Sequence, residues 1–588
     1  MSQDKKASQL SQLQSSVDDS SKTTPSPAPL TPTNDEDEIA PSTPAGGEDV
    51  ASAPQDAGGS KLNRTASTAT VQYPGSHMRA LKRRILMFSL CLALFLTALD
   101  ITIVATALPT ITRELGANAA EYSWIGSSYL LASTASGPIW AKMSDIFGRK
   151  SALLAANLLF MAGSLIAALS RTVGMLIAGR AVQGLGVGGL TVLVSIVIGD
   201  LFELKDRAKY YGMTGMVWAV AAALGPVLGG VFTQKLSWRW CFWINLPFEG
   251  VSLVVLFVVL NVDWPNVSFL NGLKSLDWIG SAMIVGGTII FLYGLETGSG
   301  GQAPWGSAQV ICLLVFGILL LASFFLYEAK LAKNPMIPMR IFNSVTNVAS
   351  FATLCVHSFI FISYDYFLPL YFQAVLHFEP IISGVSLFAM VVPLCSLTIG
   401  TGYYVKRTGD YLIPIRAGAI IMTVGTGLYI YLDATTNWAK IIVFLFVAGL
   451  GAGPLFQTPM LALQSHLDPH DIAASVSAMQ FIRNLCTSIS IVMGSVLLQR
   501  TLGGEGLSEG VGHGAGGAGQ EGPSRETYVS ALHIMWIFYT AWCGVLIVLS
   551  WLIQGRNIRA DTGKSKDSKV SDTEKGEHKS QPEPKLVA

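Results

Sequence analysis

The sequence predicts an all-α polytopic membrane protein with fourteen transmembrane helices. Fourteen apolar stretches of about 20 residues, each long enough to cross a bilayer, alternate with short polar loops between about Ile85 and Ile553. Of the 588 residues, 51% are hydrophobic and only 13% are charged, and the mean hydropathy is +0.48. A large soluble α-protein does not fit, because its helices carry a single apolar stripe. Inside lipid the backbone must satisfy its hydrogen bonds within each segment, so the stretches are expected to be helices.

The apolar stretches define the spans in order along the chain, with bounds good to a few residues. They cover residues 85–108, 123–143, 151–169, 174–199, 209–233, 243–262, 278–296, 308–328, 347–372, 381–403, 412–432, 439–463, 474–499 and 532–553. Residues 1–78 are rich in Ser, Thr, Pro and acidic residues, and such a segment buries too little apolar surface to fold. We predict a disordered tail there and a polar, Lys-rich tail at 554–588.

Lys and Arg residues concentrate in alternate loops, which predicts the orientation of the spans because cytoplasmic loops carry an excess of these residues. Basic clusters that share one side of the membrane lie at 79–84, 142–150, 205–209, 330–340 and 406–407. Both termini are therefore expected in the cytoplasm, where the sequons at Asn63 and Asn266 stay unmodified. The largest external loop, 502–526, is Gly-rich and expected to be flexible.

Charge, cysteines and missing motifs argue against other classes of function. A net charge of +1 gives no field that attracts nucleic acid. All seven cysteines fall within or at the ends of predicted spans, at no metal-ligand spacing, so we expect apolar core residues and no metal site. The chain has no GxxxxGKS or GxxxxGKT loop for ATP. His466 and His470 are the one nearby pair that suggests an enzyme, so we expect neither catalysis nor a cofactor.

A charged turn joins the second and third predicted spans. It carries Asp145, Gly148, Arg149 and Lys150, and Gly137 precedes it within the second span. Asp145 and Arg149 are four residues apart, so they can pair across one helical turn, or Asp145 can cap the N-terminus of a neighbouring helix. A solvated anchor at the membrane face is the alternative interpretation.

The fourth span contains a charge, Arg180, within an otherwise apolar helix. A charge there costs about 2.5–3.5 kcal/mol on insertion scales, so it needs an interior partner or a water-filled cavity. Gln183 lies three residues further on the same face, and glycines within 184–189 let another helix approach closely. An arginine that snorkels to the membrane surface is the alternative.

The fifth span combines Gly225, Pro226, Gly229 and Gly230. Pro226 removes one backbone hydrogen bond and is expected to kink the helix, while the glycines make a groove for a second helix. We predict a bend and a contact seam on which two halves of the protein rock. Generic packing of small residues is the alternative.

Four acidic residues fall within predicted spans. Asp100 in the first span lies deep among apolar residues, where the cost of burying a charge favours uptake of a proton. Asp365 lies about mid-span in the ninth span among aromatic residues, and Glu249 and Glu296 lie in the sixth and seventh spans. A hydrogen-bonded structural role is the alternative for each.

Together, the segments SDIFGRK, GRAVQGLGVGG, LGPVLGG, LDITIVATALP and SWRWCFWINLP closely resemble signatures of the major facilitator superfamily. Fourteen spans and the segment LDITIVATALP point to its drug:proton antiporter branch, and the chain most resembles fungal efflux pumps for toxins and other secondary metabolites. The resemblance covers about residues 80–555. Ala141 and Ala221 depart from the family pattern. The second-half counterpart of the charged turn survives only as Gly402, Lys406, Arg407 and Gly409.

The resemblance implies the major facilitator fold, with a six-helix bundle at 79–262, a linker with two inserted helices at 263–340 and a second six-helix bundle at 341–553. Substrate would bind between the bundles near mid-membrane. It also implies roles for the motifs. Asp100 and Arg180 would belong to the proton-coupling network, the charged turn with Gly137 would latch the cytoplasmic side, and the fifth-span glycines and Pro226 would set the bend. Asp365 is added to proton coupling from burial alone.

We therefore expect a proton-coupled transporter that exports small, largely apolar molecules by alternating access. Its expected partners are substrate, protons and lipid, without nucleic acid, and we expect a monomer in the plasma membrane in preference to the vacuolar membrane. Gln183, Tyr364, Phe372 and Met479 are candidates for the substrate cavity because aromatic and flexible side chains adapt to varied ligands. A fourteen-span uptake carrier, such as a siderophore–iron transporter, and a non-transporting transceptor are the alternatives.

Overall fold

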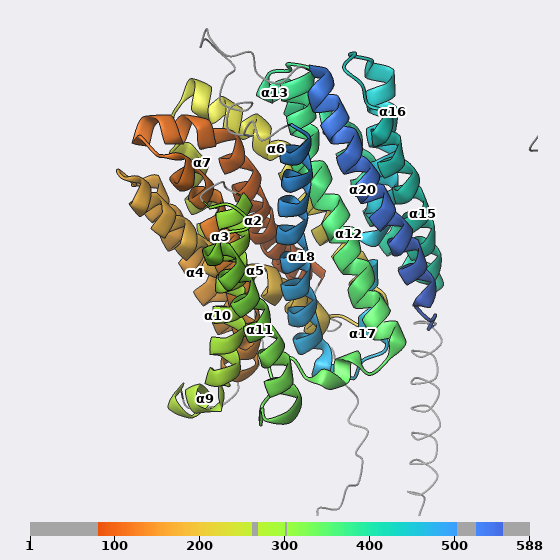
Figure 1. The fold of residues 1–588 in the computed structure, drawn as a ribbon. Coiled ribbons are helices and arrows are strands. Elements are labelled where there is room, and N and C mark those ends of the chain that lie inside the picture. Colours follow the sequence, from red (N-terminus) through yellow and green to blue (C-terminus); the bar gives the residue numbers. More distant parts are fainter. Residues whose placement is uncertain (1–79, 261–268, 300–302, 503–524, 557–588) are drawn as a thin grey trace, which may run out of the picture. The chain divides into compact units, whose positions relative to one another are not determined.

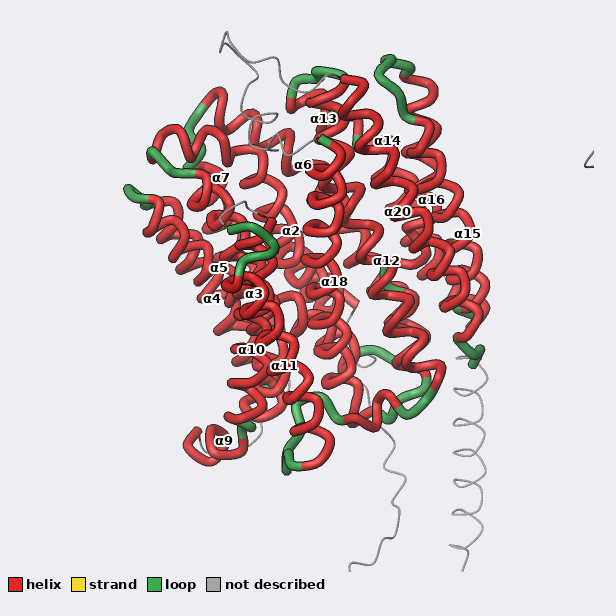
Figure 2. The backbone as a smooth tube through the Cα atoms, in the orientation of Figure 1, coloured by secondary structure: helices red, strands yellow, loops and turns green. Residues whose placement is uncertain are grey.

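The computed structural model describes residues 80–260, 269–299, 303–502 and 525–556, and the regular elements among them are helical (Figure 2). The first half contains α2 (Ala80–Leu115), α3 (Ala119–Phe147), α4 (Arg149–Ala168), α5 (Val173–Leu201), α6 (Leu204–Lys235), α7 (Trp240–Trp243) and α8 (Asn245–Val259). The middle of the chain contains α9 (Phe269–Ser275), α10 (Trp278–Ser299), α11 (Ala308–Lys330) and the short η1 (Met339–Phe342). The predicted tail at 1–78, nearly all of the tail at 554–588, most of the loop at 502–526 and both sequons lie outside the described residues.

The second half contains the remaining helices. They are α12 (Val345–Leu370), η2 (Tyr371–Val375), α13 (Pro380–Ser386), α14 (Phe388–Thr408), α15 (Leu412–Leu428), η3 (Tyr429–Tyr431), α16 (Trp438–Leu455), α17 (Thr458–Ser465), η4 (Pro469–Asp471), α18 (Ile472–Thr501) and α20 (Arg525–Leu552). Every predicted span coincides with a helix or a pair of helices. In the described chain, 13 helical segments are long and apolar enough to cross a membrane. The other span is α3, in which serines, threonines and glycines lower the hydropathy.

Some predicted spans are interrupted, which the apolar content alone did not predict. The span at 439–463 consists of α16 and α17, with a break between Leu455 and Thr458. Pro454 and Pro459 flank this break. Because proline has no backbone N–H and clashes with the preceding turn, two prolines five residues apart prevent a continuous hydrogen-bond ladder. The break leaves Phe456 between two helices, where its side chain is buried.

Two groups of helices pack within themselves and meet along a shared face (Figure 1). We call α2–α8 the first bundle and α12–α20 the second bundle. Within the first bundle, α5 packs on α3 and α4, and α6 packs on α2; within the second, α16 packs on α14 and α15. Between bundles, α6 contacts α13 and α14, and α18 contacts α3 and α5. The inserted pair, α10 and α11, packs on itself and places α10 against α3 and α18.

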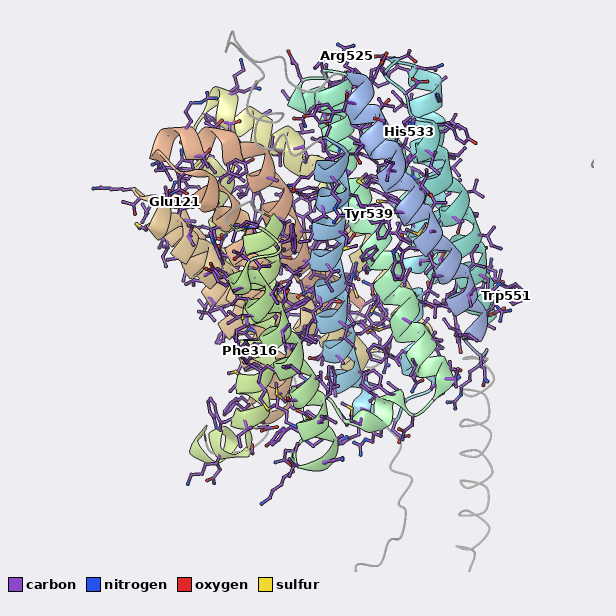
Figure 3. The ribbon with its side chains drawn as sticks, viewed as in Figure 1. Glu121, Phe316, Arg525, His533, Tyr539 and Trp551 are labelled. Carbon is purple, nitrogen blue, oxygen red and sulfur yellow. The ribbon has the colours of Figure 1, made fainter. Side chains whose placement is uncertain are left out.

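The outward faces of the helices are apolar, as a hydrocarbon environment requires. Phe316 on α11 is 63% exposed and Trp551 on α20 is 60% exposed, and both project away from the helices in Figure 3. In the most apolar 18-residue window of α11, only 17% is buried inside the structure. Such a surface would be unfavourable in water, so it fits a helix that faces lipid.

Candidate functional site

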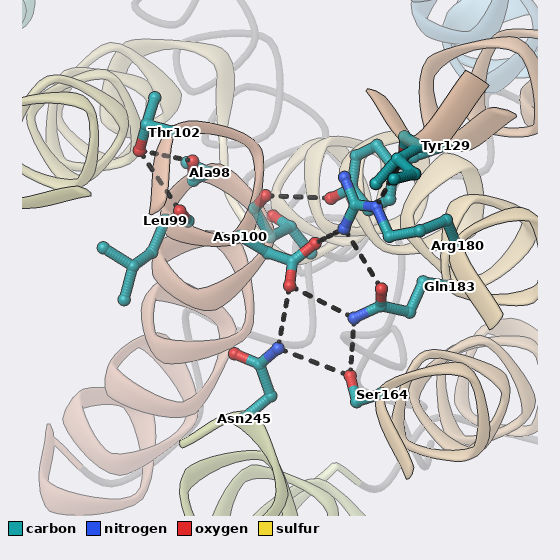
Figure 4. Close-up of polar contacts among 11 residues, drawn as sticks. Ala98, Leu99, Asp100, Thr102, Tyr129, Ser164, Arg180, Gln183 and Asn245 are labelled. Atoms are coloured by element: carbon teal, nitrogen blue, oxygen red, sulfur yellow. Dashed lines mark hydrogen bonds and ion pairs between the residues drawn. The ribbon is translucent and has the colours of Figure 1, made fainter. Parts of the chain in front are cut away.

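A buried ion pair joins α2 to α5 inside the first bundle (Figure 4). Arg180 Nη1 donates to Asp100 Oδ2, and the side chains of Arg180 and Asp100 are 2% and 0% exposed. Arg180 Nε also donates to the Ile125 carbonyl oxygen on α3 at 3.2 Å. The prediction that Arg180 needs an interior partner is confirmed, and the snorkelling alternative is wrong.

The other carboxylate oxygen of Asp100 accepts two amide hydrogen bonds. Gln183 Nε2 on α5 donates to Asp100 Oδ1 at 3.1 Å, and Asn245 Nδ2 on α8 donates to the same oxygen at 3.0 Å. Both amide nitrogens also reach Ser164 Oγ on α4, at 2.7 Å from Gln183 and 3.4 Å from Asn245. One carboxylate therefore ties together α2, α4, α5 and α8, and all of these side chains are buried.

Tyr129 on α3 completes the arrangement, which we call the Asp100 network (Asp100, Tyr129, Ser164, Arg180, Gln183 and Asn245). The Arg180 guanidinium carbon lies 4.1 Å from the centroid of the Tyr129 ring. The Tyr129 hydroxyl donates to the Thr97 carbonyl oxygen at 2.9 Å. A cation over a desolvated aromatic face gains a stabilising electrostatic interaction. The Tyr129 ring thus holds the guanidinium beside α3, and an N–H group of the guanidinium donates to the Asp100 carboxylate.

The Asp100 carboxylate is the counter-charge of Arg180 within the Asp100 network. When Asp100 is ionised, it neutralises Arg180 and accepts both amide hydrogen bonds. When Asp100 is protonated, Oδ1 still accepts from the amides, but Arg180 has no counter-charge. A buried pair that loses one charge is destabilised by about 3–5 kcal/mol.

Glycines allow the helices that carry the network to approach closely. A Cβ added at Gly184 on α5 would lie 2.3 Å from the Tyr129 carbonyl oxygen on α3. A Cβ added at Gly163 on α4 would lie 2.3 Å from the Gln183 backbone nitrogen. Both distances are far below van der Waals contact, so a side chain at either position would push Tyr129 or Gln183 out of place.

The charged turn between α3 and α4 adopts one of the two predicted arrangements of Asp145. Arg149 Nη1 donates to Asp145 Oδ1, so the pair closes across one turn instead of capping a neighbouring helix. Arg149 Nε also donates to Asp200 Oδ2 at the end of α5, at 2.7 Å. Gly148 lies between the two helices at φ 89°, a backbone conformation that favours glycine. Lys150 Nζ lies 5.0 Å from the Phe257 ring centroid on α8.

The hydrogen bonds of Asp145 and Arg149 stay within the first bundle, whereas α6 supplies nearby contacts to the second. Arg207, only 1% exposed, donates from Nη1 to Gln464 Oε1 on α17 at 3.1 Å. Gln464 Nε2 in turn donates to the Tyr211 hydroxyl at 2.8 Å. Lys406 Nζ on α14 lies 2.8 Å from Asp206 Oδ1. These polar contacts hold the two bundles together at this end of α6.

The fifth-span motif forms the expected contact seam on both sides of α6. A Cβ added at Gly225 would lie 2.0 Å from Thr102 Oγ1, and one at Gly229 would lie 2.7 Å from the Ile103 carbonyl oxygen, both on α2. Gly230 faces α13 in the second bundle, where its added Cβ would lie 3.2 Å from Ile381 Cγ1.

Pro226 completes this seam toward the second bundle. Its Cβ would lie 2.9 Å from a Cβ added at Gly384 on α13. The helix continues through Pro226 from Leu204 to Lys235. The motif therefore lies where α6 contacts α2 of its own bundle and α13 of the second bundle. Gly137 on α3 is packed less tightly, since its added Cβ would lie 3.4 Å from Val192 Cγ2 on α5.

The remaining predicted site residues lie apart from one another. Asp365 on α12 makes none of the hydrogen bonds of the Asp100 network. Tyr364 is fully buried in the second bundle, and its hydroxyl bonds to Thr426 Oγ1. Phe372 packs beside Phe378 within the same bundle. Their roles stay predictions.

Gln183 and Met479, the other two cavity candidates, are also buried. Gln183 belongs to the Asp100 network. Met479 on α18 is 1% exposed and packs in the apolar cluster that contains the first bundle's core. In this conformation the four candidates do not form one surface.

Several residues at these sites were missed in the sequence. Asn245 and Ser164 belong to the Asp100 network, yet amides and hydroxyls are common in spans and carry no charge to flag them. Arg207 lies at the start of a span, where a basic residue is expected at the membrane face. Arg483 lies well inside α18, and the same cost of a buried charge that drew attention to Arg180 would have found it.

Comparisons with known proteins agree with this architecture. The family model described as Major Facilitator Superfamily matches residues 90–491. The chain is 47% identical over 476 residues to "Efflux pump dotC" of Dothistroma septosporum, which covers 78% of this chain and 82% of the relative. It is 44% identical over 501 residues to "MFS-type transporter ppz2" of Metarhizium majus, covering 82% and 86%. The fold is similar to the crystal structure of the human organic anion transporter MFSD10, with a TM-score of 0.52 and 15% identity over 80% of this chain and 99% of that chain.

Proposed function

Because this chain belongs to the major facilitator superfamily, we propose that it is a proton-coupled secondary transporter that exports small, largely apolar organic molecules, such as secondary metabolites or toxins, by alternating access. Relatives that are named efflux pumps support export as the direction. The observation that carries proton coupling is the fully buried Asp100–Arg180 pair. A lone structural charge pair in lipid is costly, and intramembrane ionisable residues mark ion pathways by default.

In the proposed cycle, protonation of Asp100 releases Arg180 from its counter-charge. Arg180 then turns to the substrate pathway or to water, and α5 moves relative to α2 and α8, because the Asp100 network ties these helices together. Loss of the proton on the other side of the membrane restores the pair. Coupling follows because the two protonation states favour different helix arrangements.

The charged turn and the fifth-span seam are proposed to carry the conformational change. Arg149 links α3, α4 and α5 through Asp145 and Asp200, so these helices move as a unit. The glycines at 225, 229 and 230 place α6 in contact with α2 and α13, so α6 can transmit motion between the bundles. Asp365 is proposed as an additional proton-binding group in the second bundle.

The proton gradient supplies enough free energy for this work. One proton that enters down a potential of about 100 mV releases about 2.3 kcal/mol, and each pH unit adds about 1.4 kcal/mol. With a gradient of about two pH units the total is roughly 5 kcal/mol, which supports a ratio of several thousand for a neutral substrate. The loop charges support cytoplasmic termini, and we propose a monomer in the plasma membrane without enzymatic activity.

The decisive experiment uses purified protein in sealed vesicles with an imposed pH gradient. A panel of fluorescent polycyclic compounds reports solute movement, and an internal pH dye reports proton movement. The proposal expects solute to move opposite to the proton, and the gradient-driven solute movement to stop once a protonophore has collapsed the pH gradient. A substrate that moves with the proton would favour the uptake alternative. If neither solute nor protons move for any compound in the panel, proton-coupled export is wrong.

A further inference from the structure

A second arginine inside the membrane, Arg483 on α18, has no acidic partner in the part of the chain that the structure describes. Arg483 lies about 16 Å along α18 from Ile472, at about 1.5 Å rise per residue. Each ion pair between described residues uses a cation other than Arg483. Holding a charge at this depth costs about 2.5–3.5 kcal/mol on insertion scales. Arg180 offsets that cost with Asp100, and Arg483 has no equivalent.

One aromatic ring contacts the Arg483 guanidinium, and two further rings pack against that ring. The central carbon of the guanidinium lies 4.8 Å from the centroid of the Phe456 ring, in the break between α16 and α17. The Phe361 ring on α12 meets the Phe456 ring edge to face at 5.6 Å. The His357 ring stacks on Phe361 at 5.9 Å and meets Phe456 edge to face at 6.0 Å. We call Arg483, Phe456, Phe361 and His357 the Arg483 cluster.

The titratable side chains that the structure places near Arg483 are not carboxylates. They are the imidazole of His357 and the thiol of Cys355, both on α12. His357 Nε2 lies 3.2 Å from the Ala452 carbonyl oxygen, so an N–H at this position has an acceptor within the protein. Cys355 is a free thiol. The positive charge of the Arg483 cluster is therefore uncompensated by these groups.

The Arg483 cluster lies at the face where the second bundle meets the first. A Cβ added at Gly215 on α6 would lie 3.1 Å from Phe456 Cδ1, so the Phe456 ring contacts the first bundle. The helix that carries Arg483, α18, packs against α3 and α5. Arg483 itself is half-buried, unlike Arg180. In transporters built from two halves, the substrate site lies at this interface near the middle of the membrane.

We propose that the Arg483 cluster binds the anionic group of an aromatic substrate, so that the preferred cargo is an aromatic organic anion such as a carboxylate or phenolate. A guanidinium binds a carboxylate with two parallel hydrogen bonds, and the neighbouring rings provide apolar faces for an aromatic ring system. The bound anion would supply the counter-charge that the described part of the chain lacks. This inference rests on the proposed export function and specifies the cargo.

The test is equilibrium binding of three matched probes to the full chain in nanodiscs of zwitterionic lipid. The probes are 2-naphthoate, the neutral 2-naphthamide and the cationic 2-naphthylmethylammonium, radiolabelled and measured at pH 7.4. Wild type is expected to bind naphthoate at least tenfold more tightly than the amide, and the cation most weakly. Arg483→Gln should weaken naphthoate binding at least tenfold and change amide binding less than twofold, while Arg483→Lys should recover part of the preference.

Arg416→Gln is the matched control, because Arg416 stacks on Trp551 at 4.5 Å on the α15–α20 side of the second bundle, away from the Arg483 cluster. It should leave all three affinities unchanged. Unchanged amide binding by Arg483→Gln also shows that the variant is folded. Equal binding of the three probes by wild type, or an unchanged charge preference in Arg483→Gln, overturns the anion subsite while gradient-driven export in vesicles stands. A naphthoate preference that depends on Arg483 without gradient-driven flux supports the subsite and contradicts the export function.

Discussion

The proposed mechanism gives Asp100 two functions that place different demands on its surroundings. As an ionised group it stabilises the first bundle, because it accepts hydrogen bonds from Arg180, Gln183 and Asn245. As the proposed proton acceptor it must give up the charge that stabilises Arg180. Both functions depend on the burial of the pair, because water would screen the charge interaction between Asp100 and Arg180. The charge of Asp100 would then have little effect on Arg180.

A double-mutant cycle separates the charge of Asp100 from its hydrogen bonds. Asp100→Asn keeps an oxygen for the two amides but leaves Arg180 without a counter-charge, so we expect a loss of about 3–5 kcal/mol in unfolding free energy. Asp100→Asn with Arg180→Gln removes both charges and should recover most of that loss. Thermal unfolding of the purified variants measures the effect. Additive effects of the two substitutions would contradict a direct charge interaction.

At the residue scale, the sequence predicted the charges and Gln183 but missed the neutral partners on other helices. Arg180 and Asp100 stand out because a charge in an apolar segment is costly, and the structure pairs them. Asn245 and Ser164 come from helices far away in the sequence, and their role depends on packing that no local pattern encodes. Arg483 carried the same signal as Arg180, and the sequence prediction overlooked it.

At the element scale, glycines on α5 allow this helix to pack closely against α3 and α4. The residues that face α3 and α4 include Gly184 and Gly186, whose added Cβ atoms would lie 2.3 Å from the Tyr129 carbonyl oxygen and 2.5 Å from the Phe160 backbone nitrogen. Backbone atoms cannot move aside as a flexible side chain does. The interface between these helices therefore tolerates no substitution that adds a carbon atom without a shift of α3 or α4.

Two alanine substitutions on α5 test this interface against each other. Gly184→Ala should lower the unfolding free energy by about 1–3 kcal/mol through overpacking. Gly174→Ala is the matched control on the same helix, because nothing lies within 4 Å of its added Cβ. It should be neutral or slightly stabilising, since alanine favours a helix over glycine. Similar unfolding temperatures for the two variants would show that α5 packs differently.

Hydrogen bonds to Glu114 join the end of α2 to the segment before α7. Glu114 accepts from Arg239 Nη1 at 2.7 Å and from Trp238 Nε1 at 2.8 Å. The hydrogen bond from Arg239, followed by that from Trp238, lowers the pKa of the Glu114 carboxyl below its ordinary value despite partial burial. A lowered pKa in the folded state means that this stabilisation is present at neutral pH and is lost as the pH falls through the folded pKa.

Glu114→Gln should therefore destabilise the protein in a pH-dependent way. At pH 7 we expect a small loss, below about 1 kcal/mol, because half-exposed ion pairs are screened by solvent. Below the folded pKa of Glu114, wild type is protonated as well, and the two unfolding temperatures should converge. Unfolding curves of both proteins from pH 7 downward measure this. A difference that stays constant over the whole range would rule out the charge as its cause.

The helices were predicted better than their interruptions. Each span was expected because its apolar residues are continuous, and helices lie at all of the expected places. The break between α16 and α17 lies within one continuous apolar stretch, so hydropathy gives no sign of it. Pro454 and Pro459 were visible in the sequence, but one proline is tolerated inside α6 and another inside α3. Between α16 and α17, two prolines act together to interrupt the helix.

At the scale of the whole molecule, two bundles contact each other through α6, α14 and α17 at one end. Arg207 with Gln464, and Asp206 with Lys406, cross between the bundles there. Alternating access requires that such contacts break in one of the two conformations. The same end carries the charged turn, which holds α3, α4 and α5 together. The contacts of α6 therefore join the second bundle to a bundle whose helices are linked to one another at this end.

A reversible cross-link tests whether this end must open. Asp206→Cys and Lys406→Cys are introduced into a chain whose native cysteines are replaced, and a short bifunctional thiol reagent joins them. We expect transport to stop on cross-linking and to recover after reduction. Each single-cysteine variant treated with the same reagent is the control. Undiminished transport by fully cross-linked protein would mean that this end does not separate.

The fold was predictable from the sequence to the level of its helices and family because lipid leaves the backbone few alternatives. The motifs LDITIVATALP and GRAVQGLGVGG carried the family, and they also carry Asp100 and Arg180. The conformation was not predictable in this way, since an alternating-access protein has more than one arrangement of the same helices. The burial of Tyr364, Phe372 and Met479 belongs to the described arrangement.

The central claim is that Asp100 couples protons to substrate movement, and exchange measurements on Asp100→Asn test it most directly. Purified wild type and Asp100→Asn are placed in vesicles, and two fluxes are compared: substrate exchange at equal pH, and substrate accumulation driven by a pH gradient. The account predicts that the variant still exchanges substrate but accumulates none, because its Asp100 position no longer takes up a proton. Gradient-driven accumulation equal to that of wild type would contradict the account.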